Sequence, residues 1–484
     1  MTLRGNVEIL TIYQTHVIYK DETGRPILDQ IEAFCDLWSL DEERERFIKN
    51  LPDVIEDEHE IDDRVVKFWK VWMDALRNTN PKLLAYLSYM VERLLQMKIV
   101  LKPTGSIYFH CDSYASHYIK IVLDGIFGHK NFRNEIVWKK YGGHKNTAKR
   151  KFTTENDTIF LYSASKTHTF NRVFRPLSEN TIKSEYRHVD ENGRRYAIPR
   201  GRKYRQGVIK RVYLDTNPGV AVGNLWTEKE LTMQGKDNER LGYPTQKPIA
   251  LLERVINASS NEGDIVFDPF CGCGTTLEAA QRLNRKWIGI DIAIHAIKRV
   301  SAIRLNDRCK LVEGQDYQIS GIPHTIEGVN DLWERDKYQF QKWAVESVDG
   351  FVTTRKSGDG GVDGRIYFSI PDNEGLKNMV LEVKGGQRVN SSVDRQLAGQ
   401  LHDGDTLISG LIVRKPFGKI RLRNFLDYAH TLGDIQIGDK TYPRLQVLSV
   451  PEILEGKKFD TPLARGRRMS AQESLPFDKF DKNE

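Results

Sequence analysis

The chain has 484 residues, enough for two or three domains that each have a core. Its composition, 39% hydrophobic and 29% charged, is ordinary for a globular protein, and no apolar run approaches the roughly 18 residues of a membrane-spanning helix. Without a signal-peptide pattern either, we expect a cytoplasmic protein with no membrane partner. The five cysteines have no repeated spacing, which argues against a disulfide framework. Cys271 and Cys273 lack a second ligand pair at zinc-finger spacing, so we interpret them as small residues that line a loop.

The net charge of +7 is unevenly distributed. Residues Lys130 to Arg211 hold 21 Lys and Arg against 7 Asp and Glu, a local charge of +14, which leaves about −7 for the rest. Aromatic residues such as Trp138, Tyr196 and Tyr204 are interleaved with these charges. This pattern indicates a polyanionic partner, and we expect double-stranded DNA. The alternative is a basic surface that only contacts solvent.

The first elements alternate between helix and strand. The acidic stretch at residues 40–64 is expected to be an exposed insertion, either helical or mobile. Apolar residues at helical spacing then predict a helix over 81–101. A turn at 102–105, a strand at 106–111, a helix at 114–127 and a strand that ends at Trp138 follow. This alternation predicts a parallel α/β sheet. Residues 142–156 and 187–211 lack apolar periodicity and are expected to be basic loops that order on binding.

A glycine-rich turn forms the next feature. The run DPFCGCGTT, Asp268 to Thr276, follows the apolar stretch 265–267 and precedes a helical pattern. Gly272 and Gly274 permit a tight turn, and the helix start at Thr275 offers unpaired amide groups. A second strand then delivers Asp291 about 20 residues on, where a carboxylate can accept the hydroxyls of a ribose. The layout indicates a nucleotide-type cofactor site, with a turn that binds no ligand as the alternative.

The segment YPTQKPIALLERVI, residues 243–256, stands just upstream of this turn. With DPFCGCGTT it resembles the β-class DNA amino-methyltransferases, in which a TQKP segment precedes a DPFxGxGTT loop. The resemblance implies that both segments bind S-adenosylmethionine, the loop along its methionine part and the later acid on its ribose. The residues that would take these roles are Thr245, Lys247, Pro248, Asp268, Phe270, Gly272, Gly274, Thr275 and Asp291.

The resemblance extends over residues 17–319 and includes the segments LKPTGSIYFHCD and FRNEIVW. It implies a Rossmann-like α/β methyltransferase sheet and an inserted target-recognition segment. The implied reaction transfers a methyl group to the exocyclic amino group of adenine or, as the less favoured substrate, cytosine. Arginine suits both phosphate contacts and guanine recognition, so the sequence does not separate these two roles in the insert.

One part of the family pattern is missing. These enzymes hold the amino group of a flipped-out base with a DPPY-like tetrapeptide, which should lie before about Tyr19. The chain has no adjacent prolines, and its opening, MTLRGNVEILTIYQTH, contains no such motif. We therefore expect either a late or altered start or the loss of the central catalytic strand, which would expose part of the sheet. Methyl transfer by this chain is in doubt on this ground, whereas cofactor binding is not.

A second pattern follows residue 319. Residues 322–336 are expected to be a connector, and a helix is predicted over 337–350. Asp363 then begins a strand, and Glu382 and Lys384 share one face of the strand 379–384. Two carboxylates at adjacent strand ends can hold Mg²⁺, and a nearby lysine can orient or deprotonate the attacking water. The pattern indicates a PD-(D/E)xK nuclease site, with unconnected surface charges as the alternative.

The glycine-rich run GDGGVDG before this pair resembles the Mrr-type restriction endonucleases. The resemblance implies that Asp363 and Glu382 are metal ligands and that Lys384 completes the site. Gln341 stands where relatives often carry an acid, which leaves the metal affinity open. Gln400 is expected on the following helix, near the site.

We predict a restriction-modification type protein that joins two α/β units. The expected division is a catalytic half at 1–130, a DNA-recognition segment at 131–240, a cofactor-binding half at 241–319, a linker at 320–336, a nuclease-like domain at 337–455 and a tail at 456–484. One rival is a silent methyltransferase fold that binds DNA and cofactor while the C-terminal domain cleaves. Another is an NAD-dependent oxidoreductase, in which the TQKP segment and the basic stretch would have no role. A homodimer is an open alternative.

Overall fold

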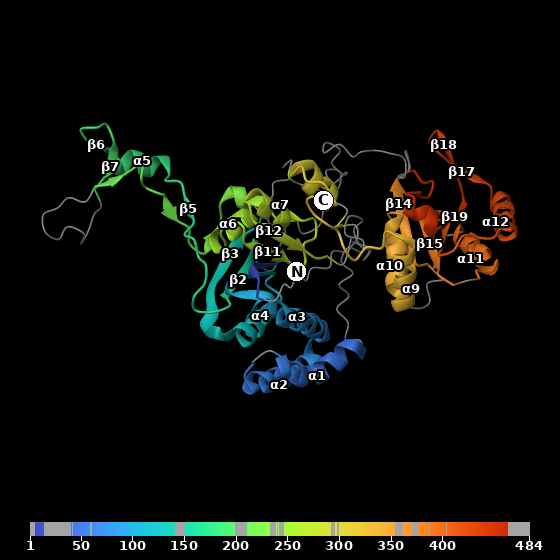
Figure 1. Ribbon diagram of the computed structural model, residues 1–484, viewed down its shortest axis with the longest axis horizontal. Coiled ribbons are helices and arrows are strands. Elements are labelled where there is room, and N and C mark those ends of the chain that lie inside the picture. The colour runs from blue at the N-terminus through green and yellow to red at the C-terminus, as the bar shows by residue number, and fades with distance from the viewer. Residues whose placement is uncertain are drawn as a thin grey trace.

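The structure is a computed structural model with two α/β units and a projecting arm (Figure 1). It describes residues 5–13, 40, 42–58, 61–140, 150, 152–198, 211–232, 239, 241, 246–291, 296–297, 300–353, 362–369, 376–386, 388–402 and 404–462. Within these ranges, no helix is both long and apolar enough to cross a membrane.

The first unit is built on a seven-stranded sheet. Its strands, from one edge to the other, are β10 (Leu225–Trp226), β3 (Phe132–Lys139), β4 (Asn156–Ser163), β2 (Leu101–Cys111), β1 (Val7–Tyr13), β11 (Ile265–Asp268) and β12 (Lys286–Gly289). The last four are mutually parallel, but β4 is antiparallel to both β2 and β3. The sheet is therefore mixed, and the expectation of a fully parallel sheet was wrong. Antiparallel neighbours such as β3 and β4 need no crossover helix.

Strand β1 occupies a central position in this sheet. It pairs in parallel with β2 on one side and with β11 on the other, with Ile9 opposite both Ser106 and Val266. Its described side chains are buried, because helices cover both faces of the sheet. The alternative of a lost central strand is therefore wrong. The residues that follow β1, 14–39, lie outside the described part of the chain.

Helices cover the two faces of the sheet. Alternate β1 residues point to opposite sides, so that Leu10 joins one apolar core and Ile9 the other. The first face carries α1 (Glu42–Glu58), α2 (Asp63–Thr79), α3 (Pro81–Val100), α4 (Ser116–Leu123) and the turn η2 (Asp124–Gly128). The second carries α6 (Ile249–Ser259) and α7 (Thr275–Arg282). The acidic stretch 40–64 is helical as expected but not simply exposed, because Ile48 and Leu51 are buried in the first core.

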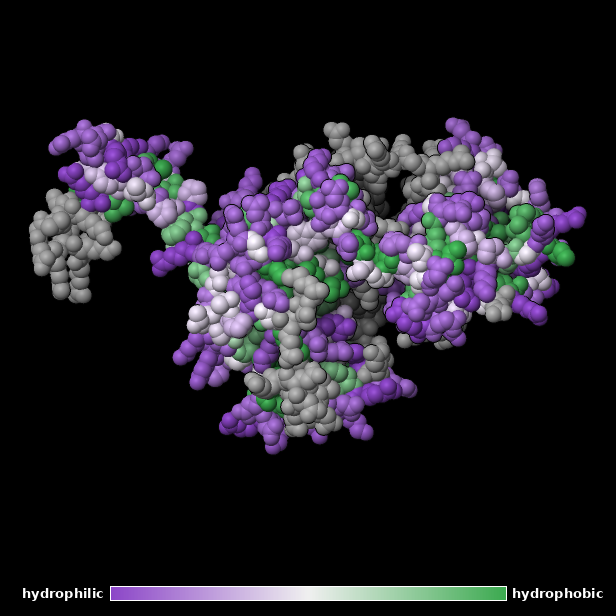
Figure 2. Space-filling view, viewed as in Figure 1, coloured by the Kyte–Doolittle hydropathy of each residue, from purple (hydrophilic) through white to green (hydrophobic). Residues whose placement is uncertain are grey.

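An arm extends from the sheet between β4 and β10 (Figure 1). Its elements are β5 (Phe174–Arg175), α5 (Glu179–Glu185), β6 (His188–Val189), β7 (Arg195–Ala197), β8 (Val212–Tyr213) and β9 (Val220–Ala221). A pairing of β5 with β9 forms its neck. Glycine is needed at position 219, because φ is 108° there and a Cβ would lie 2.1 Å from the Arg175 carbonyl oxygen. The visible face of the arm is mostly hydrophilic (Figure 2).

The second unit has a five-stranded sheet in the order β13 (Phe351–Val352), β14 (Gly364–Ser369), β15 (Leu376–Lys384), β16 (Thr406–Val413) and β19 (Leu445–Ser449). Its helices are α9 (Ile326–Arg335), α10 (Lys337–Ser347), α11 (Ser392–Gln400), α12 (Lys419–Leu432) and α13 (Val450–Leu454), with a hairpin of β17 (Asp434–Ile437) and β18 (Lys440–Pro443). Residues expected as a connector form α9, whose Val329 is fully buried in the core with α10. Both units are α/β, as predicted from the sequence.

Three short elements complete the described structure. They are η3 (His129–Asn131) and η4 (Lys229–Leu231), both 3-10 turns, and η5 (Val300–Arg308), a π-helical segment. Segment η5 packs beside α7 through Leu305, and this contact sets the position of the arginines described below.

Candidate cofactor, DNA and metal sites

The ends of several strands meet at one edge of the first sheet. Tyr13 at the end of β1 lies opposite His110 of β2, and Asp268 at the end of β11 lies opposite Gly289 of β12. The antiparallel strand β4 begins at the same edge, with Asp157 as its second residue. Carboxyl ends of parallel strands are the usual place for a ligand in an open α/β sheet. The glycine-rich run and Asp291 lie at this edge.

The glycine-rich run forms a tight loop between β11 and α7. Gly272 and Gly274 have positive φ values of 48° and 71°, as expected where a side chain would be strained. The Cys271 amide donates to the Ile290 carbonyl at 2.9 Å, and the Gly272 amide donates to Asp291 Oδ2 at 2.8 Å. The loop is therefore tied to the end of β12, and it holds the Asp291 carboxylate beside the glycines.

Asp268 lies beneath this loop and is 2% exposed. Its Oδ1 accepts from the Phe270 amide at 3.1 Å, and its Oδ2 accepts from the Thr276 hydroxyl at 2.5 Å. Burial raises the pKa of Asp268 to about 7, although the Thr276 hydroxyl acts in the opposite direction. The nearby charge of Asp291 raises this pKa further. Asp268 therefore holds the loop, and its own charge is costly there.

Lys247 brings the TQKP segment to the same edge. Lys247 is 8% exposed. Burial lowers the pKa of its ammonium group to about 8, although the carboxylates of Asp157 and Asp268 act to raise it. Pro248 precedes the first turn of α6 as its N-cap residue. Of the predicted cofactor residues, the structure gathers Asp268, Phe270, Gly272, Gly274, Thr275, Asp291 and Lys247 around one edge of the sheet. Thr245 lies outside the described residues.

A buried polar group that sequence reasoning missed lies next to this site. His110 Nε2 and Asp157 Oδ2 are 3.0 Å apart, and Lys140 Nζ lies 2.6 Å from Asp157 Oδ1. Burial and the charge of Lys247 lower the pKa of His110 to about 4, so the imidazole is neutral at pH 7. The sequence signal for this group was the family segment SIYFHCD, because its members lie far apart in sequence, on β2, on β4 and just after β3.

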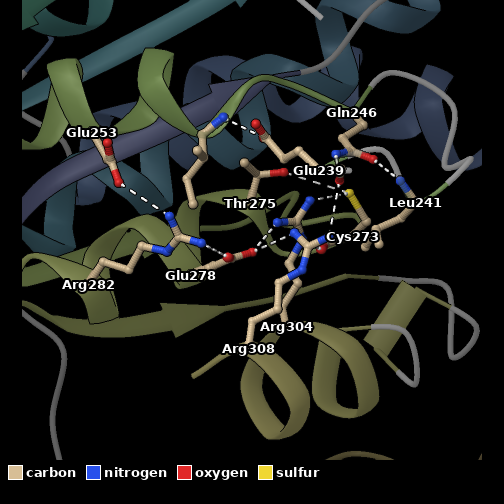
Figure 3. Close-up of polar contacts among 11 residues, drawn as sticks. Glu239, Leu241, Gln246, Glu253, Cys273, Thr275, Glu278, Arg282, Arg304 and Arg308 are labelled. Carbon is tan, nitrogen blue, oxygen red and sulfur yellow. Dashed lines mark hydrogen bonds and ion pairs between the residues drawn. The ribbon is translucent and has the colours of Figure 1, made fainter. Parts of the chain in front are cut away.

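A second missed group joins the loop to the TQKP segment (Figure 3). Glu278 of α7 is fully buried and forms ion pairs with Arg304, with Arg282 at 2.6 Å and with Arg308 at 3.3 Å. Arg304 also donates to the Cys273 carbonyl of the glycine loop. Arg308 reaches the Glu239 carbonyl at 3.4 Å, which in turn accepts from the Gln246 side chain at 2.8 Å. The arginines therefore connect both predicted cofactor-binding segments.

In the second unit, Asp363 lies at the start of β14, beside β15. Its Oδ2 accepts from the Val383 amide at 2.6 Å, and its Oδ1 accepts from the Gln341 side chain of α10. The Gln341 side chain thus contacts Asp363, which is a predicted metal ligand. Gln400 is the last residue of α11, the helix on which it was expected.

Glu382 lies one residue before Val383 on β15, and its side chain is 2% exposed. Lys384 Nζ lies 2.6 Å from Glu382 Oε1, whereas neither carboxylate oxygen has a well-formed hydrogen bond in the described structure. Burial raises the pKa of Glu382, and Asp363 and Asp394 raise it further against the effect of Lys384. Asp394 of α11, which sequence reasoning missed, is 3% exposed and pairs with Arg421 at 2.6 Å.

These residues fit a hard divalent cation in part. The buried Glu382 carboxylate contacts the Lys384 ammonium, and a bound cation would stabilise its charge further, with Asp363 as a second oxygen ligand. Among the described residues, no group of three or more His, Cys, Asp or Glu side chains is arranged to hold a metal. The protein would therefore supply two carboxylates, and water or a phosphate oxygen the remaining ligands.

The sequence model of the DNA methylase family matches residues 69–302. This part of the chain, which includes β2 to β12 and the arm, is thus similar in sequence to DNA methylases. The finding agrees with the resemblance drawn from the TQKP segment and the glycine loop.

Curated relatives match over the same region. The chain is similar to the type II methyltransferase M.EcaI of Enterobacter cloacae, 30% identical over 260 residues, covering 45% of this chain and 56% of the relative. It is also similar to the DNA adenine methyltransferase YhdJ of Escherichia coli K12, 30% identical over 214 residues, covering 44% and 65%. The chain spans about half to two thirds of the length of these relatives.

Solved structures give distant likenesses. The cytosine-N4-specific PvuII DNA methyltransferase is 14% identical at a TM-score of 0.32, covering 69% of this chain and 86% of its own. The complex of M1.HpyAVI with SAM is 21% identical at a TM-score of 0.29, covering 45% and 82%. The fold assignment accordingly rests on the strand order of this chain.

Proposed function

We propose that the first unit binds S-adenosylmethionine and DNA and transfers a methyl group to an exocyclic amino group of a base. The observation that carries this proposal is the bond from the Gly272 amide to Asp291 at the ends of β11 and β12. It puts a carboxylate for ribose hydroxyls next to a glycine loop whose backbone a ligand can approach. The match of residues 69–302 to DNA methylases supports the same function.

When bound, the cofactor supplies an electrophilic methyl group on sulfonium. The residues of this chain bind and orient it: the loop at Gly272 and Gly274 provides close backbone approach, and Asp291 accepts from the ribose. Lys247, held near Asp157 and Asp268, places a cation among carboxylates at the sheet edge. The neutral His110 and its partner Asp157 lie beside the end of β1, where the family tetrapeptide would follow.

The arm and its basic residues are the proposed DNA-recognition segment. Arg172, Arg175, Lys183 and Arg187 are exposed, and the arm stands away from the sheet (Figure 1). Exposed arginine and lysine can bind phosphates and release counterions. Adenine is the proposed target and cytosine the less favoured one; the match to YhdJ, a DNA adenine methyltransferase, favours adenine.

Methyl transfer is tested with radiolabelled S-adenosylmethionine and unmethylated bacterial DNA, using the full chain. Incorporation into adenine, identified by nucleoside chromatography, is the expected result. The Asp291→Ala variant serves as the cofactor-site control and should lose incorporation. Cofactor binding without incorporation would contradict the methylation proposal and favour the second candidate.

The second candidate is a DNA- and cofactor-binding protein whose activity is Mg²⁺-dependent DNA cleavage by the second unit. Specific support comes from the buried Glu382 carboxylate, Asp363 and Lys384 on adjacent strands. Mg²⁺ would bind to Asp363 and Glu382 and provide Lewis-acid activation of a phosphodiester. Lys384 is placed to orient or deprotonate the attacking water.

Cleavage is tested by nicking of supercoiled plasmid with and without Mg²⁺. Nicking should survive Asp291→Ala but not Asp363→Ala or Lys384→Ala. The exposed Lys415→Ala variant is a matched lysine control. Nicking that persists in both Asp363→Ala and Lys384→Ala would exclude this site as its source.

A further inference from the structure

A cavity of about 460 Å³ lies between the edge strand β12 and helix α10 of the second unit. On one side it is lined by Gly289, Ile290 and Asp291, the end of β12 and the residue that binds the glycine loop. On the other side it is lined by α10. Its volume is within the range of about 300–1,000 Å³ that is typical for small-molecule pockets.

Helix α10 presents one stripe of side chains to this cavity. Gln339, Lys342, Trp343 and Glu346 all line it, at the spacing that places residues on one face of a helix. Gln341 is two residues from Gln339 and is thus turned about 200° around the helix axis. On that other side its amide donates to Asp363. One helix therefore contacts both the cavity and the proposed metal ligand.

The chemistry of the cavity suits a nucleoside. Trp287 and Trp343 contribute aromatic surface from the two units, Asp291 offers a carboxylate for ribose hydroxyls, and Gln339 provides amide groups that can bond to a base edge. Apolar walls with a few polar groups are the usual composition of a ligand pocket.

We propose that α10 forms the outer wall of the nucleoside-binding pocket and links its occupancy to the metal site at Asp363 through Gln341. This inference rests on the proposed cofactor binding at Asp291. A ligand against Gln339 and Lys342 fixes the position of α10, and the Gln341 amide then holds one orientation of the Asp363 carboxylate. Linkage requires the effect to be reciprocal: Mg²⁺ must change the affinity for the nucleoside by the same factor as the nucleoside changes that for Mg²⁺.

Calorimetry on the full chain tests the wall directly, with S-adenosylhomocysteine as the probe. Lys342→Ala and Gln339→Ala should each weaken its binding at least about fivefold, because each removes a wall contact. Lys337→Ala is the matched control: Lys337 is exposed on the same helix, and its Nζ lies 5.5 Å from the Trp333 ring. Its affinity should equal that of the natural chain.

The coupling is tested by repeating the titrations with Mg²⁺ present and by titrating Mg²⁺ with the pocket filled. The two affinities should change by one common factor of at least about fivefold, a value typical of coupled sites. Gln341→Ala should reduce this factor to one while leaving S-adenosylhomocysteine bound.

The outcomes separate this inference from the proposed function. Weakened binding in Asp291→Ala alone, with Lys342→Ala and Gln339→Ala unchanged, would overturn the wall and leave cofactor binding intact. Weakened binding in Lys342→Ala and Gln339→Ala, together with a coupling factor of one between S-adenosylhomocysteine and Mg²⁺ in the natural chain, would overturn the link to Asp363. No binding of S-adenosylhomocysteine by the natural chain would overturn both the proposed function and this inference.

Discussion

Arg304 and Glu278 form an ion pair in which both side chains are 0% exposed. Arg304 belongs to η5 and Glu278 to α7, and the same guanidinium donates to the Cys273 carbonyl in the glycine loop (Figure 3). The pair thus supports the loop from beneath. Buried pairs are costly to break. Loss of Arg304 would remove a buried partner of Glu278, which keeps Arg282 and Arg308, and would also remove the donor to the Cys273 carbonyl.

Arg304→Ala should therefore lower the free energy of unfolding by about 3 kcal/mol or more. Denaturant unfolding measures the change. Arg282→Ala provides the control, because the Arg282 side chain is 48% exposed although it contacts the same carboxylate at 2.6 Å. That variant should lose less than about 1 kcal/mol, as exposed pairs do. Equal losses in both variants would show that burial does not set the strength of this group.

Asp291→Ala should weaken S-adenosylmethionine binding at least about tenfold, through loss of a charge-assisted contact of about 1.5–3 kcal/mol. Calorimetry gives the affinity. Asp291→Asn keeps an acceptor for the Gly272 amide and removes only the charge. Its affinity for S-adenosylmethionine should therefore lie between those of the natural chain and of Asp291→Ala. Unchanged affinity in Asp291→Ala would remove this residue from the site.

Asp268 predicts a pH dependence of stability. Its pKa rises from 3.8 to about 7 in the folded chain, so the folded state binds an extra proton between these values. The stabilisation linked to this proton is complete below pH 3.8 and is lost as pH rises toward 7. Asp268→Asn should make the free energy of unfolding less dependent on pH between about 4 and 7. The same slope in both proteins would place the proton on another group.

Glu382→Gln should raise the free energy of unfolding at neutral pH without metal, because burial disfavours the charged carboxylate and raises its pKa. The natural chain should gain thermal stability when Mg²⁺ is added, since a ligand that binds the folded state stabilises it. The variant should lose this gain. A gain from Mg²⁺ that is equal in both proteins would exclude Glu382 as a ligand.

DNA affinity should fall steeply with added salt, because basic side chains of the arm release counterions from phosphates. Arg175→Ala and Arg187→Ala should each reduce the slope of log affinity against log salt by about 1. Lys70→Ala, an exposed lysine on α2, should leave the slope unchanged. A flat dependence in the natural chain would mean that the basic stretch only contacts solvent.

The parts predicted from the sequence are those with local signals. The turn at Gly272 and Gly274 follows from its strand, glycine and helix pattern, and the loop meets Asp291 as the spacing suggested. The pairing of His110 with Asp157 had no such signal, because it depends on the order of β2 and β4 in the sheet. The roles of the predicted site residues stay predictions.

Strand β1 shows the other limit of sequence reasoning. Its apolar residues are enough to form a central strand, although the tetrapeptide that would have identified it is missing. The strand can therefore form without the family motif. Apolar packing on both faces of the sheet requires the strand, whereas the motif is required only by the chemistry. Helix α9 was likewise missed, because Val329 and Leu332 pack against residues distant in sequence.

The neck of the arm has a consequence for how such proteins diversify. Asn171 is anchored to the end of α6 through the Ala258 and Ser260 carbonyls, and Val222 is paired back to Val173. These contacts fix both ends of the arm close to the sheet, so the arm joins the sheet only through its neck. Under the proposed DNA-recognition role, exchange of the arm would give the same sheet a new target sequence.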